Sequence, residues 1–282
     1  MEKYYLLYNP FARSGYVDLE AKYLDVCNHL CNTEMIDVTS VNDYTEFIGK
    51  INKEDGIVVC GGDGTLNNFI NHIDGIRVDN KVFYYPLGTG NDFYRDITGS
   101  REGHIIEITD LIKNLPTVAV KNNKYKFING VGYGIDGYCC AVGDELREKN
   151  KKKINYASIA VKGLLFHYKP TSATVIVDGK EYCFDNVWIA PTMKGKCYGG
   201  GMIPTPDQNR NGHELSVMIF HGKSKLRTLT IFPSIFKGEH VKHEKYVSIF
   251  KGKNITVKFN EPRPLQVDGE TILDVLEYTA KI

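Results

Sequence analysis

Three glycines surround a single aspartate in the segment Val58–Asn68, directly after a run of apolar, β-branched residues. This order predicts a strand, a tight turn and the start of a helix. Glycines let the backbone approach a ligand closely, and the free amides of a helix N-terminus attract an anion such as phosphate. Asp63 suits such a loop if Mg²⁺ or a reacting hydroxyl is also present. The alternative is a turn whose glycines serve conformation only, but Gly-Gly-Asp-Gly-Thr after a strand favours phosphate chemistry.

Two further loops can contact the same ligand. The loop after the first predicted strand carries Asn9 and Arg13, for which a structural turn and a nucleotide contact are equally supported. The loop Tyr85–Phe93 follows the fourth predicted strand, and in it Thr89 can donate to a phosphate, while Asp92 can cap a helix or hold Mg²⁺. Ligands bind at the carboxyl ends of parallel strands, so these loops are expected at one edge of the sheet.

The elements that position these loops alternate between strand and helix patterns, which predicts a parallel sheet covered on both faces. After Pro116 the texture changes to alternating and β-branched runs separated by turns such as Asp178-Gly179, which predicts a mainly β domain of sandwich or barrel type. Strands are expected at 3–8, 34–38, 56–60, 81–85, 117–121, 125–129, 173–178, 182–190, 215–220, 241–250 and 254–259, and helices at 17–30, 43–51, 66–73, 136–149 and 154–168. The predicted domains are 1–122 and 123–271, with 272–282 as a candidate to rejoin the first domain.

Composition argues against several classes of partner. Thirty-five Lys and Arg residues balance thirty-four Asp and Glu residues, so no overall field recruits nucleic acid, and none is expected as a partner. Seven cysteines without a Cys-x-x-Cys pair indicate neither a zinc site nor a disulfide framework, in keeping with a reducing cytoplasm. The N-terminus is predicted to be a strand rather than a signal peptide, and no apolar run approaches the ~18–20 residues that span a bilayer.

In this order and spacing, Asn9-Pro10, Gly61–Thr65 and Pro86–Phe93 resemble the diacylglycerol kinase catalytic-domain family, which includes bacterial diacylglycerol and YegS-like lipid kinases, sphingosine kinases and ceramide kinase. The resemblance covers nearly the whole chain, continuing through residues 127–134, 198–202 and 266–270. It implies a Rossmann-like α/β nucleotide-binding domain of NAD kinase/diacylglycerol kinase type, a β-sandwich acceptor domain, and an active site in the cleft between them. It also implies ATP as donor and Mg²⁺ as cofactor.

The same resemblance assigns roles to individual residues. Glu270 supplies the acid/base carboxylate with Asp268 beside it, and Asp63 organises the phosphate and metal network. By themselves, Asp268-Gly269-Glu270 are better explained as a hairpin turn. The residues implied in ATP binding are Asn9, Pro10, Phe11, Ala12, Arg13, Thr39, Gly61, Gly62, Asp63, Gly64, Thr65, Leu66, Asn67, Asn68, Thr89, Gly90, Asn91 and Asp92.

Three positions depart from the family pattern. Arg13 stands where a glycine is common, and Asn68 stands where the family usually has a glutamate. Asn211 replaces an aspartate that helps to bind a structural Mg²⁺ in bacterial relatives; the matching ligand positions are Gln208, Asn211 and His213. Loss of the negative charge weakens a site that relies on carboxylates.

The function that follows is ATP-dependent transfer of a γ-phosphate to a lipid hydroxyl, with diacylglycerol or a related lipid alcohol as acceptor and phosphatidic acid as the product from diacylglycerol. A cytoplasmic enzyme of this kind must dock on membranes peripherally, and the basic run 147–153 with the following segment 154–168 is one candidate surface. An NAD kinase-like enzyme and a catalytically weak lipid- or nucleotide-binding regulator are the alternatives. A homodimer is left open.

Overall fold

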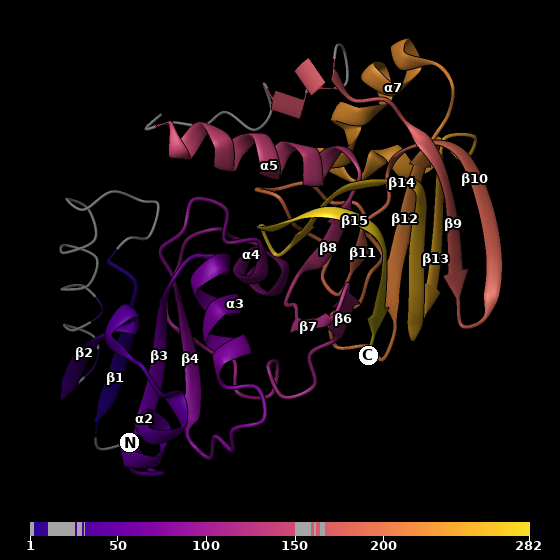
Figure 1. The fold of residues 1–282 in the computed structure, drawn as a ribbon. Coiled ribbons are helices and arrows are strands. Elements are labelled where there is room, and N and C mark those ends of the chain that lie inside the picture. Colours follow the sequence, from indigo (N-terminus) through magenta and orange to yellow (C-terminus); the bar gives the residue numbers. More distant parts are fainter. Residues whose placement is uncertain are drawn as a thin grey trace. The chain divides into compact units, whose positions relative to one another are not determined.

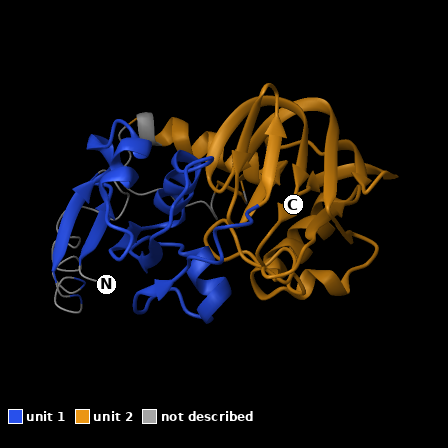
Figure 2. Ribbon diagram, turned by 90° about the horizontal axis from the view of Figure 1, so that it is seen from below, with its two compact units in different colours: residues 1–115 blue, residues 116–282 orange. Residues whose placement is uncertain are grey.

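The computed structural model describes residues 3–10, 26, 30, 32–149, 159–160, 162–163 and 167–282. The chain divides into two compact units, Met1–Leu115 and Pro116–Ile282 (Figure 2). This division lies seven residues before the predicted one, because strand β6 (Thr117–Val120) pairs with strand β15 (Glu270–Lys281) of the second unit. The C-terminal segment 272–282 belongs to β15, so it joins the second unit and not the first.

The first unit is built on a sheet whose described strands run in the order β2-β1-β3-β4-β5. The first four are parallel, as the alternating pattern predicts, and the short β5 is antiparallel to β4. All six residues of β3 are buried, which explains its continuous apolar sequence. The strands are β1 (Tyr4–Tyr8), β2 (Thr33–Asp37), β3 (Gly56–Gly61), β4 (Lys81–Pro86) and β5 (Ile106–Glu107).

Helices follow the strands of this unit. A short 3₁₀ helix, η1 (Val38–Ser40), follows β2, and then come α2 (Tyr44–Lys50), α3 (Asp63–His72) and α4 (Asp92–Thr98). Figure 1 shows α3 alongside β3 and β4. Tyr44 of α2 packs against Phe69 of α3 with ring centroids 6.2 Å apart, so the two helices share one layer.

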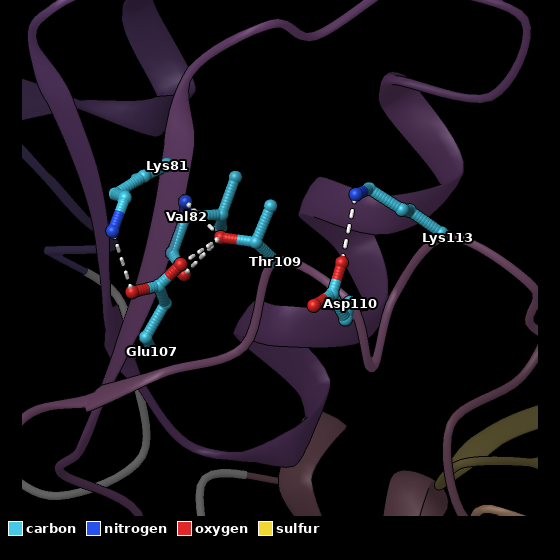
Figure 3. A network of polar contacts seen from close by, with 6 residues as sticks. All are labelled: Lys81, Val82, Glu107, Thr109, Asp110 and Lys113. Carbon is cyan, nitrogen blue, oxygen red and sulfur yellow. Dashed lines mark hydrogen bonds and ion pairs between the residues drawn. The ribbon is translucent and has the colours of Figure 1, made fainter.

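A polar network fastens the chain at the last strand of this sheet (Figure 3). Lys81 of β4 lies 3.1 Å from the Glu107 carboxylate of β5. The Thr109 hydroxyl accepts a hydrogen bond from the Val82 amide at 3.0 Å and donates to Glu107 at 3.1 Å. The exposed ion pair contributes little by itself, but the Thr109 bond extends the pairing of β4 beyond the end of β5.

The second unit is dominated by strands whose pairing closes into a ring. The long strand β14 (Asn254–Val267) pairs with β9 (Thr171–Val177) through its first half and with β8 (Gly130–Tyr133) through its second half. The other ring members are β11 (Thr192–Met193), β12 (Leu215–His221) and β10 (Lys180–Ile189). Strands β6, β7 (Asn123–Lys126) and β15 extend from β14, and β13 (Val247–Gly252) pairs with β12. The predicted sandwich or barrel is therefore confirmed.

Helices cover part of this β unit. Helix α5 (Ile135–Glu148) confirms the predicted helix at 136–149, and the short α7 (Lys225–Ile231), η3 (Phe232–Lys237) and η4 (Glu239–Lys242) were not predicted. Residues 241–250 are not one strand: η4 occupies the start, because buried His240 bonds the Pro204 carbonyl at 2.9 Å. The predicted helices at 17–30 and 154–168 lie mostly outside the described residues.

Candidate functional site

The loops with chemical potential in the first unit follow one edge of its sheet. The register pairs Tyr8 at the end of β1 with Asp37 and Cys60, and it pairs Gly61 with Pro86. The segments that begin at Asn9, Val38, Gly62 and Leu87 therefore leave the sheet at the same edge, as the parallel pattern predicts.

Asp63 joins two of these loops. Its carboxylate accepts hydrogen bonds from the backbone amides of Asp92 and Phe93, each at 2.9 Å. These amides belong to the first turn of α4, which has no side-chain cap of its own at Asn91. Asp63 thus supplies the cap from a distant loop, and its negative charge favours the positive end of the helix dipole. Asp63 of the glycine loop therefore has structural partners in the first turn of α4.

The glycines in the two loops allow the backbones to touch. A Cβ built on Gly88 would lie 2.5 Å from the Cα of Gly62, so no side chain fits there. The Gly61 carbonyl accepts hydrogen bonds from the Leu87 amide at 2.9 Å and from the Tyr84 hydroxyl at 3.0 Å. Gly62 and Gly88 are therefore required by the contact between the loops, whereas a Cβ on Gly61 would meet the Thr65 side chain at 2.5 Å.

Gly64 differs from these glycines. A Cβ built on it meets nothing within 4 Å, and the residue is exposed in the first turn of α3. The preceding N-cap, Gly62, offers no side chain, so no side-chain oxygen caps the first amides of α3. Open space in front of uncapped helix amides is the arrangement that binds phosphate. The residues at this edge therefore fit a phosphate-bearing ligand.

The remaining residues implied in ATP binding separate into surface and interior positions. Thr39, Thr89 and Asn68 are exposed, and the Thr39 hydroxyl donates to Asp37 at 2.7 Å. The following are buried: Leu66, Asn67, Asn91 and Asp92. Asn91 shapes its loop, because it adopts a left-handed conformation and its side chain bonds the Gly88 amide at 2.9 Å. Asn9, Pro10, Thr65 and Gly90 are partly exposed, whereas Phe11, Ala12 and Arg13 lie outside the described residues.

In the second unit, Asp268 holds the turn that carries Glu270. Asp268 and Gly269 have positive φ values of 46° and 98° and form the two-residue turn between β14 and β15. The Asp268 carboxylate accepts hydrogen bonds from the Asn129 and Gly130 amides at 2.9 and 3.0 Å, and also from the Ile128 amide. These bonds explain why the predicted strand 125–129 is interrupted after Lys126, since the Ile128 and Asn129 amides bind a carboxylate and not a neighbouring strand.

Glu270 occupies the first position of β15 and is exposed to solvent. Its neighbour Thr271 donates a hydrogen bond to Asp144 of α5 at 2.6 Å. Gln266 accepts a hydrogen bond from the Gly269 amide at 2.7 Å. The turn is therefore held on both sides while the Glu270 carboxylate faces solvent. Among Asp268 and Glu270, only Glu270 is presented to an external reactant.

A buried acid, Asp136, lies near this turn, and no motif in the sequence pointed to it. Asp136, at the start of α5, accepts hydrogen bonds from the Tyr198 hydroxyl at 2.8 Å and the Gly137 amide at 2.9 Å. Burial raises the pKa of Asp136 to about 6, although the bonds from Tyr198, Gly137 and Gln266 oppose this shift. Gly132 faces this carboxylate so closely that a Cβ there would lie 1.6 Å from it.

The three positions matched to a structural Mg²⁺ do not form a metal site. Buried Gln208 uses its amide nitrogen on the carbonyls of Glu214 and Lys194, at 2.9 and 3.3 Å, and its oxygen accepts the Ser216 hydroxyl. Asn211 and His213 are exposed. Across the part of the chain that the structure describes, no group of three or more His, Cys, Asp or Glu residues is arranged to hold a metal. These three positions contain no carboxylate, and the Gln208 side chain is already engaged by hydrogen bonds, so they do not fit Mg²⁺.

Two cationic residues near these positions, Lys194 and Arg210, were not selected from the sequence. Lys194 is 6% exposed, and burial, with the nearby charge of Arg210, lowers its pKa to about 8. The only signal in the sequence was a lysine directly after buried Thr192-Met193. Arg210 lies in a polar loop, where nothing in the pattern distinguished it from a solvated surface residue.

Comparison with known proteins identifies the family. Residues 3–121 match the model described as "Diacylglycerol kinase catalytic domain", and residues 129–278 match the "YegS C-terminal NAD kinase beta sandwich-like domain". The chain belongs to the diacylglycerol kinase family. It is accordingly a lipid kinase of this family, which implies ATP as the phosphate donor. The resemblance recognised from the loop motifs is confirmed, and the kinase prediction with it.

Named relatives share this assignment at low identity. The chain is 24% identical over 210 residues to a diacylglycerol kinase of Mycobacterium tuberculosis, covering 72% of this chain and 67% of the relative. It is 25% identical over 221 residues to a diacylglycerol kinase of Bacillus subtilis, covering 77% and 71% of the two chains. A crystal structure of a diacylglycerol kinase from Bacillus anthracis superposes with a TM-score of 0.65 over 99% of this chain and 93% of that one, at 22% identity, which shows a shared fold.

Proposed function

We propose that this lipid kinase transfers the γ-phosphate of ATP to a lipid hydroxyl, with diacylglycerol as acceptor and phosphatidic acid as product. The observation that carries the proposal is a pairing of chemistries within one chain. The first unit offers uncapped helix amides beside Gly64, and the second offers the exposed Glu270 carboxylate on a turn fixed by Asp268. Phosphoryl transfer requires these two functions, charge neutralisation and positioning of a proton acceptor.

On the nucleotide side, the first amides of α3 bind the phosphates, with Thr65 and Thr89 as hydroxyl donors. Asp63 holds the two glycine loops in register through the Asp92 and Phe93 amides, so its main task is positioning. Mg²⁺ is proposed to arrive with ATP, where it would neutralise phosphate charge.

On the acceptor side, Glu270 accepts the proton of the attacking lipid hydroxyl. Its exposure on the turn leaves both oxygens accessible to a substrate. Asp268 positions Glu270, because its own carboxylate is engaged with the amides of Ile128, Asn129 and Gly130. The family resemblance implies Glu270 as the acid/base carboxylate with Asp268 beside it, and the hydrogen bonds of Asp268 favour Glu270 as well.

The test offers radiolabelled ATP and Mg²⁺ to the purified full chain with vesicles that contain diacylglycerol, and in separate reactions with sphingosine, ceramide or soluble NAD. We expect label in phosphatidic acid, and its loss in Glu270→Gln. Label in NAD without lipid would support the NAD kinase-like alternative. Tight ATP binding without transfer to any acceptor would support the regulator alternative and contradict the proposal.

Docking on a membrane surface remains part of this proposal. None of the described helices is both long and apolar enough to span a membrane. Most of the basic segment predicted for docking lies outside the described residues, but α7 provides a second surface that includes Lys225, Leu226 and Arg227. The Leu226 side chain is 73% exposed between the two cations, which suits an anionic bilayer surface. Sedimentation with anionic vesicles, with Leu226→Asp as comparison, tests this surface. A mass measurement in solution tests whether the chain forms a homodimer.

A further inference from the structure

The loop of residues 207–214, which precedes β12, is closed by hydrogen bonds within the protein. The Gln208 amide bonds the carbonyls of Lys194 and Glu214, and its oxygen accepts the Ser216 hydroxyl. Asn211, where bacterial relatives are expected to carry a metal-binding aspartate, has an exposed side chain. Of the predicted ligand positions, Gln208 therefore orders the loop through hydrogen bonds, with both its amide nitrogen and its amide oxygen engaged.

A buried ammonium reaches into this loop from outside it. The Nζ atom of Lys194 donates a hydrogen bond to the Gly212 carbonyl at 2.9 Å. The backbone amide of Lys194 donates to the Asn129 carbonyl at 2.9 Å, which fixes the base of the side chain. A lysine is seldom buried unless its charge has a use. Here the positive charge faces the backbone oxygen of a loop for which the family resemblance implies a divalent cation.

A second cation links the same loop to the turn that carries Glu270. The Arg210 guanidinium donates to the Ile128 carbonyl and, at 2.8 Å, to the Asn129 side-chain oxygen. The amides of the same short segment hold the Asp268 carboxylate. Arg210 therefore binds oxygen atoms of Ile128 and Asn129, and Asp268 binds the backbone amides of the same two residues.

We propose that Lys194 and Arg210 replace the structural Mg²⁺ of related kinases, so that the 207–214 loop is held by cations of the chain itself. Through Ile128–Gly130 the same pair positions the turn that presents Glu270. They are positioning residues, since neither contacts the reacting groups. The first statement stands on the contacts alone, whereas the effect on turnover rests on the proposed function of Glu270.

The first experiment measures the wild-type chain, with Asn211→Ala as its comparison. Its Tm is measured without nucleotide in EDTA and in increasing MgCl₂. We expect the same Tm within about 1 °C, because a loop that binds no metal gains no stability by linkage. A saturable rise of several degrees that disappears in Asn211→Ala would overturn the proposal.

The second experiment exchanges the ammonium for a metal. Lys194→Met is compared with Lys223→Met, which removes an exposed lysine. We expect Lys194→Met to lower Tm by at least about 5 °C and Lys223→Met to leave it unchanged. Adding Asn211→Asp to Lys194→Met should create a variant that MgCl₂ stabilises. Equal Tm values for the two single variants would overturn the proposal. A double variant whose Tm does not rise with MgCl₂ would overturn it as well.

The third measurement tests positioning. In Lys194→Met we expect kcat to fall about tenfold while KM for ATP stays unchanged, because displacement of a catalytic group affects turnover more than binding. MgCl₂ above the amount that ATP needs should restore turnover in the double variant only. Unchanged kcat in Lys194→Met would remove the positioning role. If no lipid is phosphorylated at all, the proposed function fails, but the Tm measurements still test whether Lys194 and Arg210 replace the metal. If Lys194→Met does not fold, the MgCl₂ titration of the wild-type chain provides that test.

Discussion

Both units contain an aspartate whose carboxylate is engaged by backbone amides, but the two clamps leave different groups available. In the first unit, Asp63 binds the Asp92 and Phe93 amides and joins two glycine loops. In the second unit, Asp268 binds the amides of Ile128, Asn129 and Gly130 and fixes a hairpin turn. The first clamp leaves uncapped helix amides beside it, which are positive, whereas the second leaves the Glu270 carboxylate, which is negative.

These two aspartates show that an acidic residue in a glycine-rich motif need not be the group that reacts. Amides compete for a carboxylate as effectively as a substrate or a metal does, and charge-assisted hydrogen bonds of this kind are strong. In the proposed mechanism, Asp63 and Asp268 position the loops and Glu270 accepts the proton.

Glu270→Gln should lower kcat by about 10²–10⁴-fold, the usual contribution of a general base. The exposed side chain contributes little to folding, so Tm should stay within about 1 °C of wild type. Steady-state kinetics with labelled ATP and calorimetric unfolding provide the two readouts. A loss of less than threefold in kcat would assign the proton transfer to another group and would contradict the role proposed for Glu270.

Asp268→Ala should destabilise the second unit by about 3 kcal/mol, because it leaves three amides without their charged acceptor. Asp63→Ala removes an acceptor from two amides and should cost the first unit about 2 kcal/mol. Denaturant unfolding followed by signals from each unit measures both values. If Asp268→Ala abolished turnover without any loss of stability, Asp268 would be a reacting group and not a clamp.

Asp136→Asn should stabilise the second unit at neutral pH. The folded-state pKa of about 6 lies above the ordinary value of 3.8, so between these values only the folded state keeps the proton. Stability therefore falls as pH rises from about 4 to 6, and above pH 6 the charged form costs up to about 3 kcal/mol. The variant should lack this decline. Equal pH dependence of Tm in both proteins would show that Asp136 is not the group responsible.

Two glycine substitutions give the smallest effects and the sharpest contrast. Gly88→Ala places a Cβ against Gly62 and should cost about 1–3 kcal/mol of stability, as overpacking does. Gly64→Ala meets open space, so stability should change by less than about 1 kcal/mol. Its methyl group faces the proposed phosphate site, and KM for ATP should rise about tenfold, equivalent to about 1.4 kcal/mol. An unchanged KM would move the phosphate away from α3.

Much of the fold could be predicted from the chain, because it depends on local patterns. Alternating strand and helix periods gave the parallel sheet, and Asp178-Gly179 gave a hairpin turn whose two residues have positive φ. Prediction failed where distant groups override local preference. Ile128 and Asn129 leave the strand pattern because their amides bind the Asp268 carboxylate. Residues near His240 form a 3₁₀ helix, with His240 bonded to the Pro204 carbonyl.

The candidate site divides in the same way. The loops around Gly62 and Gly88 could be found from sequence because glycine is the residue type that permits close backbone contact. By contrast, the partners of Asp63 lie about thirty positions away and those of Asp268 lie about 140 positions away. Spacing of residue types carries no information about such partners.

The family, the two kinds of domain and the loops that can carry phosphate chemistry could be identified from the amino-acid sequence, since they follow from residue types and short-range periodicity. Which carboxylates are engaged and which one is exposed depends on the three-dimensional fold. So does the placement of Lys194 and Arg210 against backbone carbonyls near the positions matched to a structural Mg²⁺. The physical reason is that a charged group acts according to its partners and its burial, and both are set by segments brought together from far apart in the chain.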